Sequence, residues 1–93
     1  MNTLADIQFE EDVAIDEIST ETYRLILHND DTNTFDWVIS ALVDVCRHSY
    51  EQAEQCSYII HHKGKYAVKH GSLTRLKPMK DAIIDRGISA TIE

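Results

Sequence analysis

Residues 23–38, YRLILHNDDTNTFDWV, contain the pattern that decides the fold. Apolar residues alternate at 23, 25 and 27, which is typical of a β-strand, and an amphipathic helix begins about ten residues later. Between them lies NDDTN, a run of side chains that accept hydrogen bonds from free backbone amides. Thr34 is placed to cap the helix, and Asp36 favours its positive end. Carboxylates at such a turn suit the binding of a cationic group, and no nucleophile motif or phosphate-binding loop follows.

The next segments predict two helices and a second strand. Helical spacing of Val38, Leu42 and Val45 carries the first helix to about residue 47. Ser49 and Gln52 form a capping box for a helix over residues 50–62, which Gly64 then ends. Residues 65–70 can form a strand.

The C-terminal part predicts a third helix and a last strand. Leu73, Leu76 and Ile83 recur at helical spacing, and Gly87 ends the pattern. Pro78 fits if the helix proper begins near Lys77, because proline is tolerated in a first turn. Residues 88–93 close the chain as a strand. The order β-α-α-β-α-β predicts an α+β domain, with a three-stranded antiparallel sheet packed against three helices.

The acidic residues are unevenly distributed. The first 21 residues contain seven Asp and Glu residues and no Lys or Arg, which equals the whole net charge of −7. The remaining 72 residues balance nine acidic against nine basic residues. We expect a flexible acidic N-terminal arm over residues 1–21, followed by one small domain over residues 22–93.

Composition also argues against several classes of function. The arm has no basic segment ahead of an apolar one, so we expect no signal peptide. No apolar run approaches the ~20 residues that span a bilayer, so we expect no membrane partner. A nucleic-acid partner would require a basic face. Two cysteines, Cys46 and Cys56, without secretory features indicate buried, reduced thiols in a cytoplasmic protein. Cys46 and His48 point apart on a helix, so we expect no metal and no cofactor.

Several separated motifs resemble one known family. The strand leads into Asn-Asp-Asp at residues 29–31, and FDWV follows at residues 35–38. The segment HHKGK at residues 61–65 is similar to the His-x-x-Gly-Lys segment that follows the second helix in that family. Residues 89–93 are similar to its last strand. Over residues 23–93 the chain thus resembles the ClpS adaptors of the bacterial N-degron pathway.

The resemblance implies an adaptor rather than an enzyme. Such an adaptor binds the free N-terminus of a protein whose first residue is large and hydrophobic. It then delivers that substrate to a Clp-type AAA+ unfoldase and its protease, by docking as a monomer on the unfoldase N-terminal domain. The resemblance implies that Asn29, Asp30 and His61 hold the α-amino group. It also implies a hydrophobic pocket lined by Asn33, Phe35, Val38, Ala41, Ser57 and Ile60.

The chemistry of these residue types independently suits an α-ammonium group. That group has three donors and is largely charged at neutral pH. An amide oxygen, a carboxylate and a neutral imidazole can accept from it in different directions. An imidazole accepts only when it is unprotonated, so binding should weaken at acidic pH. Because an acetylated or internal residue would leave these acceptors unpaired, we expect the free N-terminus to be the main recognition element.

Some positions differ from the family pattern. Thr32 and Thr34 stand where the family usually has Tyr and Pro. Phe35 replaces a gating Met, and Ser57 replaces a second Met in the pocket wall. We expect aromatic first residues to be accepted, and the acceptance of leucine is left open.

Two other functions remain open at this stage. A small hydrolase could use Asp30 and His61 as an acid/base pair, or Cys46 as a nucleophile. A domain of the same fold could dock on a Clp unfoldase without binding N-degrons. Structural roles are the alternatives for individual residues: Asn29 and the aspartates could only cap the helix, and Phe35 could belong to the core. We expect the other histidines at the surface or at strand edges; these are His28, His48, His62 and His70.

Overall fold

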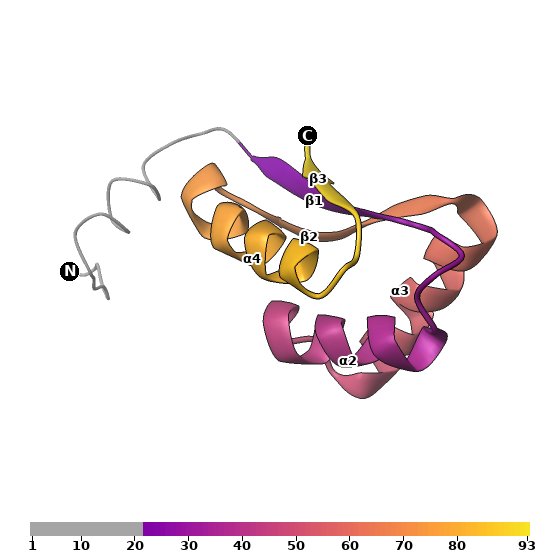
Figure 1. Ribbon diagram of the computed structural model, residues 1–93. Helices are drawn as coiled ribbons and strands as arrows, with labels where there is room; N and C mark the ends of the chain where they lie inside the picture. Colours follow the sequence, from indigo (N-terminus) through magenta and orange to yellow (C-terminus); the bar gives the residue numbers. More distant parts are fainter. Residues whose placement is uncertain (1–21) are drawn as a thin grey trace.

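The computed structural model describes residues 22–93, and the predicted acidic arm lies outside the described residues. Helices and strands follow one another in the predicted order, β-α-α-β-α-β (Figure 1). The elements are β1 (Tyr23–His28), α2 (Phe35–Cys46), α3 (Tyr50–Lys63), β2 (Lys65–Gly71), α4 (Leu73–Asp85) and β3 (Ala90–Ile92).

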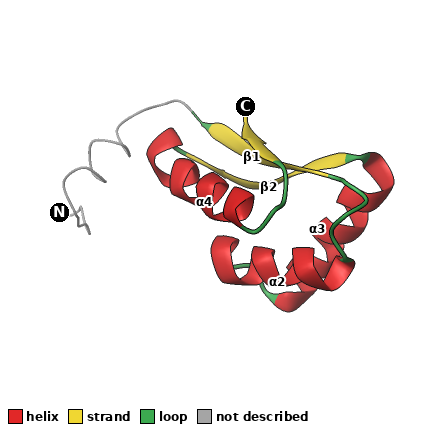
Figure 2. Ribbon diagram, in the orientation of Figure 1, coloured by secondary structure: helices red, strands yellow, loops and turns green. Residues whose placement is uncertain are grey.

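The strands form one antiparallel sheet, with β1 in the centre between β2 and β3. The helices gather on one side of this sheet (Figure 2). The inward side chains of β1, Leu25 and Leu27, are fully buried against helix residues such as Leu42 and Ile83. The predicted α+β class, with three helices on a three-stranded sheet, is confirmed.

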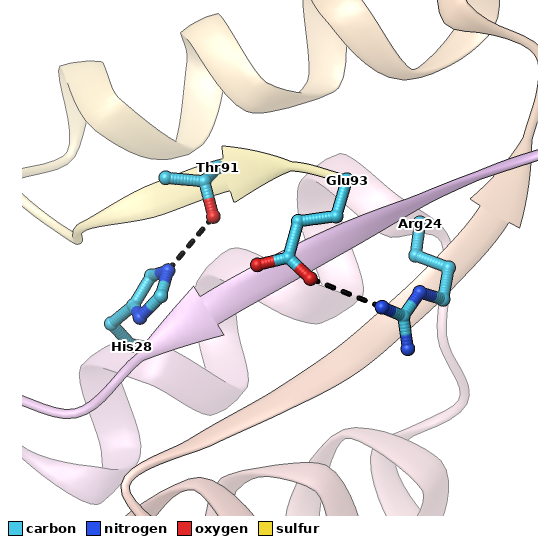
Figure 3. Close-up of polar contacts among 4 residues, drawn as sticks. All are labelled: Arg24, His28, Thr91 and Glu93. Carbon is cyan, nitrogen blue, oxygen red and sulfur yellow. Dashed lines mark hydrogen bonds and ion pairs between the residues drawn. The ribbon is translucent and has the colours of Figure 1, made fainter.

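The short strand β3 is fixed to β1 at both of its ends. Backbone groups of Arg24 and Glu93 exchange two hydrogen bonds at 2.8 and 2.9 Å. Their side chains form an ion pair at 3.0 Å, and His28 Nε2 hydrogen-bonds Thr91 Oγ1 at 2.8 Å (Figure 3). The strand is shorter than the predicted 88–93, because the Ile88 backbone amide donates to the Ile83 carbonyl at the end of α4.

The predicted caps of the first two helices are confirmed. The Thr34 hydroxyl accepts from the Trp37 backbone amide, and the Ser49 hydroxyl accepts from that of Gln52, both at 3.1 Å. Gly64 ends α3 with a left-handed conformation (φ 93°), which glycine adopts without strain. These caps fix where the loop before α2 ends and where α3 stops.

The predicted start of the third helix is wrong. Ser72 caps α4, so the helix begins at Leu73 and Pro78 lies inside it. Proline removes the hydrogen bond that would reach the Thr74 carbonyl. Both Thr74 and Pro78 are exposed, so water can satisfy that carbonyl. Burial of Leu76 elsewhere on the helix stabilises the first turns despite the lost bond.

One predicted surface histidine is buried instead. His48 is only 4% exposed, and its Nε2 donates to the Val68 carbonyl at 2.9 Å. The pairing of β1 with β2 shifts between Leu25 and Ile26, which pair with Lys69 and Ala67 and leave Val68 between them as a bulge. Burial lowers the pKa of His48, and nearby Lys69 lowers it further, while its bond to Val68 acts in the opposite direction.

Both cysteines are buried free thiols, as predicted. Burial raises the pKa of Cys46 to about 11 and also raises that of Cys56. A thiol that is protonated and buried is a poor nucleophile. Residues 22–93 contain no group of three or more potential ligands that could hold a metal ion. In the same part of the chain, no helix is long and apolar enough to cross a membrane.

Candidate functional site

A cavity of about 30 Å³ lies where β1 ends and α2 begins, and α3 forms its other wall. Its inner lining is mainly apolar: Leu27, Ile60 and Ile88 are nearly or fully buried, and Ser57 is the one buried polar residue among the lining residues. The outer lining is mostly polar, apart from Phe35 and Val38, and comes mainly from the loop between β1 and α2. The full lining is Leu27, His28, Asn29, Asp30, Asn33, Thr34, Phe35, Val38, Ser57, Ile60, His61 and Ile88.

Asp30 organises the loop that forms the mouth of the cavity. Its Oδ1 accepts from the backbone amides of Thr32 and Asn33 at 2.9 and 3.0 Å. The Asn33 side-chain amide donates to Oδ1 at 3.0 Å and to Oδ2 at 2.9 Å. A carboxylate offers about four acceptor positions, two on each oxygen, so Oδ2 can accept a further donor. The loop is thus closed around a negative charge that can still bind a cationic group.

Asn33 also connects this loop to the C-terminal part of the chain. Its Nδ2 donates to the Gly87 carbonyl at 3.0 Å. The next residue, Ile88, also lines the cavity. One amide side chain therefore joins the loop before α2 to the loop after α4, and both loops contribute lining residues.

The backbone of Asn29 fixes the start of the loop against the end of α3. Its amide donates to the Gly64 carbonyl at 2.8 Å. Asn29 and His61 are both exposed and both line the cavity. The mouth of the cavity thus has an amide, a carboxylate and an imidazole from two different elements.

Three residues of α3 line the cavity because they share one face of the helix. Ser57, Ile60 and His61 follow the spacing i, i+3 and i+4. Ser57 and Ile60 are buried, whereas His61 lies one turn further along at the exposed end. Its ring packs edge-on against Phe35, with the ring centroids 5.3 Å apart.

Phe35 and Trp37 point to different places at the start of α2. Phe35 lines the cavity and is 40% exposed, so it lies at the rim. Trp37 is 43% exposed, and its Nε1 donates to the Arg86 carbonyl at 2.8 Å. Arg86 in turn forms an ion pair with Asp44 at 3.3 Å. Trp37 therefore fastens α2 to the loop after α4, beside the cavity.

The structure brings together all but one of the residues that the resemblance assigned to the site. Ala41 is the exception: it is fully buried in the core and is not part of the lining. Four lining residues were not anticipated: Leu27, His28, Thr34 and Ile88. Leu27 and Thr34 adjoin the loop and could have been inferred from their position. Ile88 comes close only through the packing of α4 and β3, which no local signal indicates.

The fold and the cavity together define a class of protein: a small α+β domain with an apolar cavity and a mouth of hydrogen-bond acceptors. Such a mouth is suited to hold an amine, and the apolar interior is suited to a side chain attached to it. Asp30 and His61 would be available for acid/base chemistry, but Cys46 is buried and protonated, which removes the one nucleophile considered above.

The chain belongs to the ClpS family: the family described as "ATP-dependent Clp protease adaptor protein ClpS" matches residues 19–90. The predicted resemblance is therefore confirmed. By that description, members of the family are adaptors of the Clp protease rather than enzymes.

Individual relatives agree with this assignment. The Clp protease adapter protein ClpS of Nitratidesulfovibrio vulgaris strain DP4 is 40% identical over 60 residues, which cover 64% of this chain and 54% of the relative. The ClpS protein of Campylobacter jejuni subsp. jejuni serotype O:23/36 is 43% identical over 42 residues, 45% of this chain and 44% of the relative. The matches thus span about half the length of these curated relatives.

A solved structure shares the fold. Agrobacterium tumefaciens ClpS2, bound to L-phenylalaninamide, matches with a TM-score of 0.69 and 23% sequence identity. The match covers 81% of this chain and 98% of the other.

Proposed function

We propose that this protein is an adaptor that binds free N-termini with a large hydrophobic first residue and delivers such proteins to a Clp AAA+ unfoldase and protease. One observation carries the proposal: Asn29, Asp30 and His61 gather at the mouth of a cavity whose interior is mainly apolar. An N-terminal residue presents a charged amine and a side chain from the same carbon, and these two parts match the two parts of the site.

In this proposal the three acceptors share the α-ammonium group. Asp30 Oδ2 supplies a charge-assisted bond, while Oδ1 accepts from the loop amides and keeps the loop closed. Asn29 contributes its amide oxygen, and His61 contributes an unprotonated ring nitrogen. A peptide with an acetylated N-terminus would offer neither the charge nor the three donors, so it should bind far more weakly.

Binding of a large side chain would require the rim to move. A cavity of about 30 Å³ has room for roughly one water molecule. Phe35 is the residue placed to move, because it lies at the rim and is partly exposed at the first position of α2. We therefore propose that Phe35 turns away from His61 when the first side chain enters.

A relative with the same fold supports this ligand class. The A. tumefaciens ClpS2 structure is bound to L-phenylalaninamide. That molecule has a free α-amine and an aromatic side chain, and its amide stands in for the continuing peptide chain. The same two parts of an N-terminal phenylalanine would meet the acceptors and the apolar interior in this chain.

The delivery step adds the proposed partners and location. The protein would act as a monomer in the cytoplasm, docked on the N-terminal domain of the unfoldase, with residues 1–21 as an acidic arm that helps delivery. Deleting residues 1–20 tests the arm. Slower degradation with unchanged peptide affinity would support a delivery role, and no change in either would contradict it.

The decisive experiment is a titration of this protein into a fluorescent decapeptide that begins with Phe, alongside its N-acetylated twin. Micromolar or tighter binding of the free-amine peptide alone is expected. Asp30→Asn should weaken that binding, because the amide keeps an acceptor for the loop but loses the charge. Asp31→Asn is the matched control, since Asp31 is the neighbouring carboxylate and does not line the cavity. Equal binding of both peptides would overturn the proposal.

The small cavity volume favours a second candidate: a ClpS-like domain that docks on a Clp unfoldase without binding N-degrons. In that case Phe35 would close the cavity permanently. Binding of this protein to the unfoldase N-terminal domain, with no affinity for either decapeptide, would identify this function instead.

A further inference from the structure

Ser57 combines burial with an unsatisfied hydroxyl group. The residue is 3% exposed, and its Oγ has no hydrogen-bond partner. Among residues 22–93, only one other buried side-chain nitrogen or oxygen atom lacks a hydrogen-bond partner, Nδ1 of His48. Buried polar groups are normally hydrogen-bonded, so an exception requires an explanation.

The position of Ser57 in the cavity supplies that explanation. Four lining residues are buried: Leu27, Ser57, Ile60 and Ile88. Of these, only Ser57 has a polar side chain. It lies on the same face of α3 as His61, one helical turn away, so the wall has an acceptor for the amine at its mouth and a hydroxyl in its interior.

We infer that Ser57 sets the side-chain preference of the site, by hydrogen-bonding the hydroxyl group of an N-terminal tyrosine. This inference rests on the proposed function, because it assumes that the α-amino group lies at the mouth of the cavity. A first residue held there extends its side chain along the α3 wall toward Ser57. A serine hydroxyl is both a donor and an acceptor, and so is the phenolic group of tyrosine.

The same hydroxyl disfavours purely apolar side chains. A phenylalanine ring would leave Ser57 Oγ buried without a partner, whereas the hydroxyl group of a tyrosine would supply one. Sites that hydrogen-bond a substrate hydroxyl discriminate against the analogue that lacks it. The site should therefore prefer tyrosine to phenylalanine, two first residues that differ by one oxygen atom.

The test uses the full chain and two decapeptides that differ only in a first residue of Tyr or Phe, each with its acetylated twin. The wild-type protein should bind the Tyr peptide about five- to tenfold more tightly than the Phe peptide. Ser57→Ala should bring this ratio close to one, because the Tyr peptide loses its hydrogen-bond partner. Ser40→Ala is the matched control, because it removes a serine hydroxyl that does not line the cavity.

The outcomes separate this inference from the proposed function. If both free-amine peptides bind the wild-type protein equally, the inference is overturned and the proposed function stands. If the Tyr preference persists in Ser57→Ala, another residue provides it and the inference is also overturned. If neither peptide binds, or the acetylated twins bind as well, both the inference and the proposed function are overturned.

Discussion

His48 and His61 lie near the ends of neighbouring helices, yet one imidazole is buried and the other is exposed. His48 is buried behind the bulge of β2, where it donates to the Val68 carbonyl. His61 is exposed at the mouth of the cavity, where its ring packs against Phe35. The difference shows that burial and partners decide the role of a histidine: one stabilises the fold, and the other remains available to a ligand.

Each region also contains a buried polar atom without a partner: Nδ1 of His48 in one and Oγ of Ser57 in the other. Ser57 lines the cavity beside His61, and His48 does not. A buried polar atom without a partner lowers stability when packed side chains surround it, whereas such an atom beside a cavity can form a hydrogen bond with a ligand. Changes in the His48 region should therefore affect stability, and changes in the His61 region should affect binding.

The largest effect is expected for the buried histidine. Replacing His48→Ala removes a well-packed ring and leaves the Val68 carbonyl unpaired, so the free energy of unfolding should fall by about 2–4 kcal/mol. Denaturant-induced unfolding would measure the loss, with the exposed His70→Ala as a control that changes little. Affinity for an N-terminal peptide should not change at a temperature where the variant remains folded. Weaker binding would show that the two regions are coupled.

The exposed histidine should give the reverse result. If the proposed function is correct, His61→Ala removes one acceptor of the α-ammonium group, and the dissociation constant of a Phe- or Tyr-initiated peptide should rise roughly ten- to a hundredfold. The unfolding free energy should stay nearly constant, because the ring is exposed. His62→Ala is the matched control, since His62 is the adjacent exposed histidine and does not line the cavity. Equal losses in both variants would refute a specific role for His61.

A third difference concerns the stability of the fold at acidic pH. Because burial lowers the pKa of folded His48, the unfolded chain, with a histidine pKa near 6.5, takes up the proton first as the pH falls. The stability contributed by neutral His48 is therefore complete above about pH 6.5 and is lost below it, by up to roughly 1.4 kcal/mol per pH unit. His48→Gln does not titrate, so its unfolding free energy should vary less between pH 7 and 5. An equal slope in both proteins would contradict this.

The smallest expected effect is that of Ser57→Ala on the stability of the free protein. Ser57→Ala removes a buried hydroxyl without a partner and leaves the rest of the wall unchanged. The variant should be at least as stable as the wild-type protein, with a gain of up to about 1 kcal/mol. Thermal unfolding without ligand measures it. A clear loss of stability would mean that the hydroxyl already has a partner within the protein and is not free to bind a ligand.

Local signals predicted the helix boundaries well. The caps Thr34, Ser49 and Gly64 act on backbone groups within four residues, so their effects can be inferred from nearby sequence. Pro78 was misjudged for the converse reason. A proline disfavours a helix interior locally, but burial of Leu76 and Ile83 against the rest of the molecule keeps α4 intact around it.

The candidate site was predictable where it depends on short motifs. Asn29, Asp30 and His61 come from two such motifs, and the structure brings both to one cavity. Ala41 was assigned to the pocket, but α2 turns it into the core. The burial of His48 depends on a bulge in β2, twenty residues away, that no local pattern reveals.

The bond between the Trp37 indole and the Arg86 carbonyl gives this protein an optical reporter of its own. Trp37 is the only tryptophan in the chain, so its emission can be read without a label. The indole lies two residues from Phe35 and holds a loop that continues, through Gly87, to Ile88 in the cavity wall. Entry of a side chain that displaced Phe35 or this loop would alter the surroundings of the indole. Tryptophan fluorescence could thus follow the opening of the cavity in real time, in the unmodified protein.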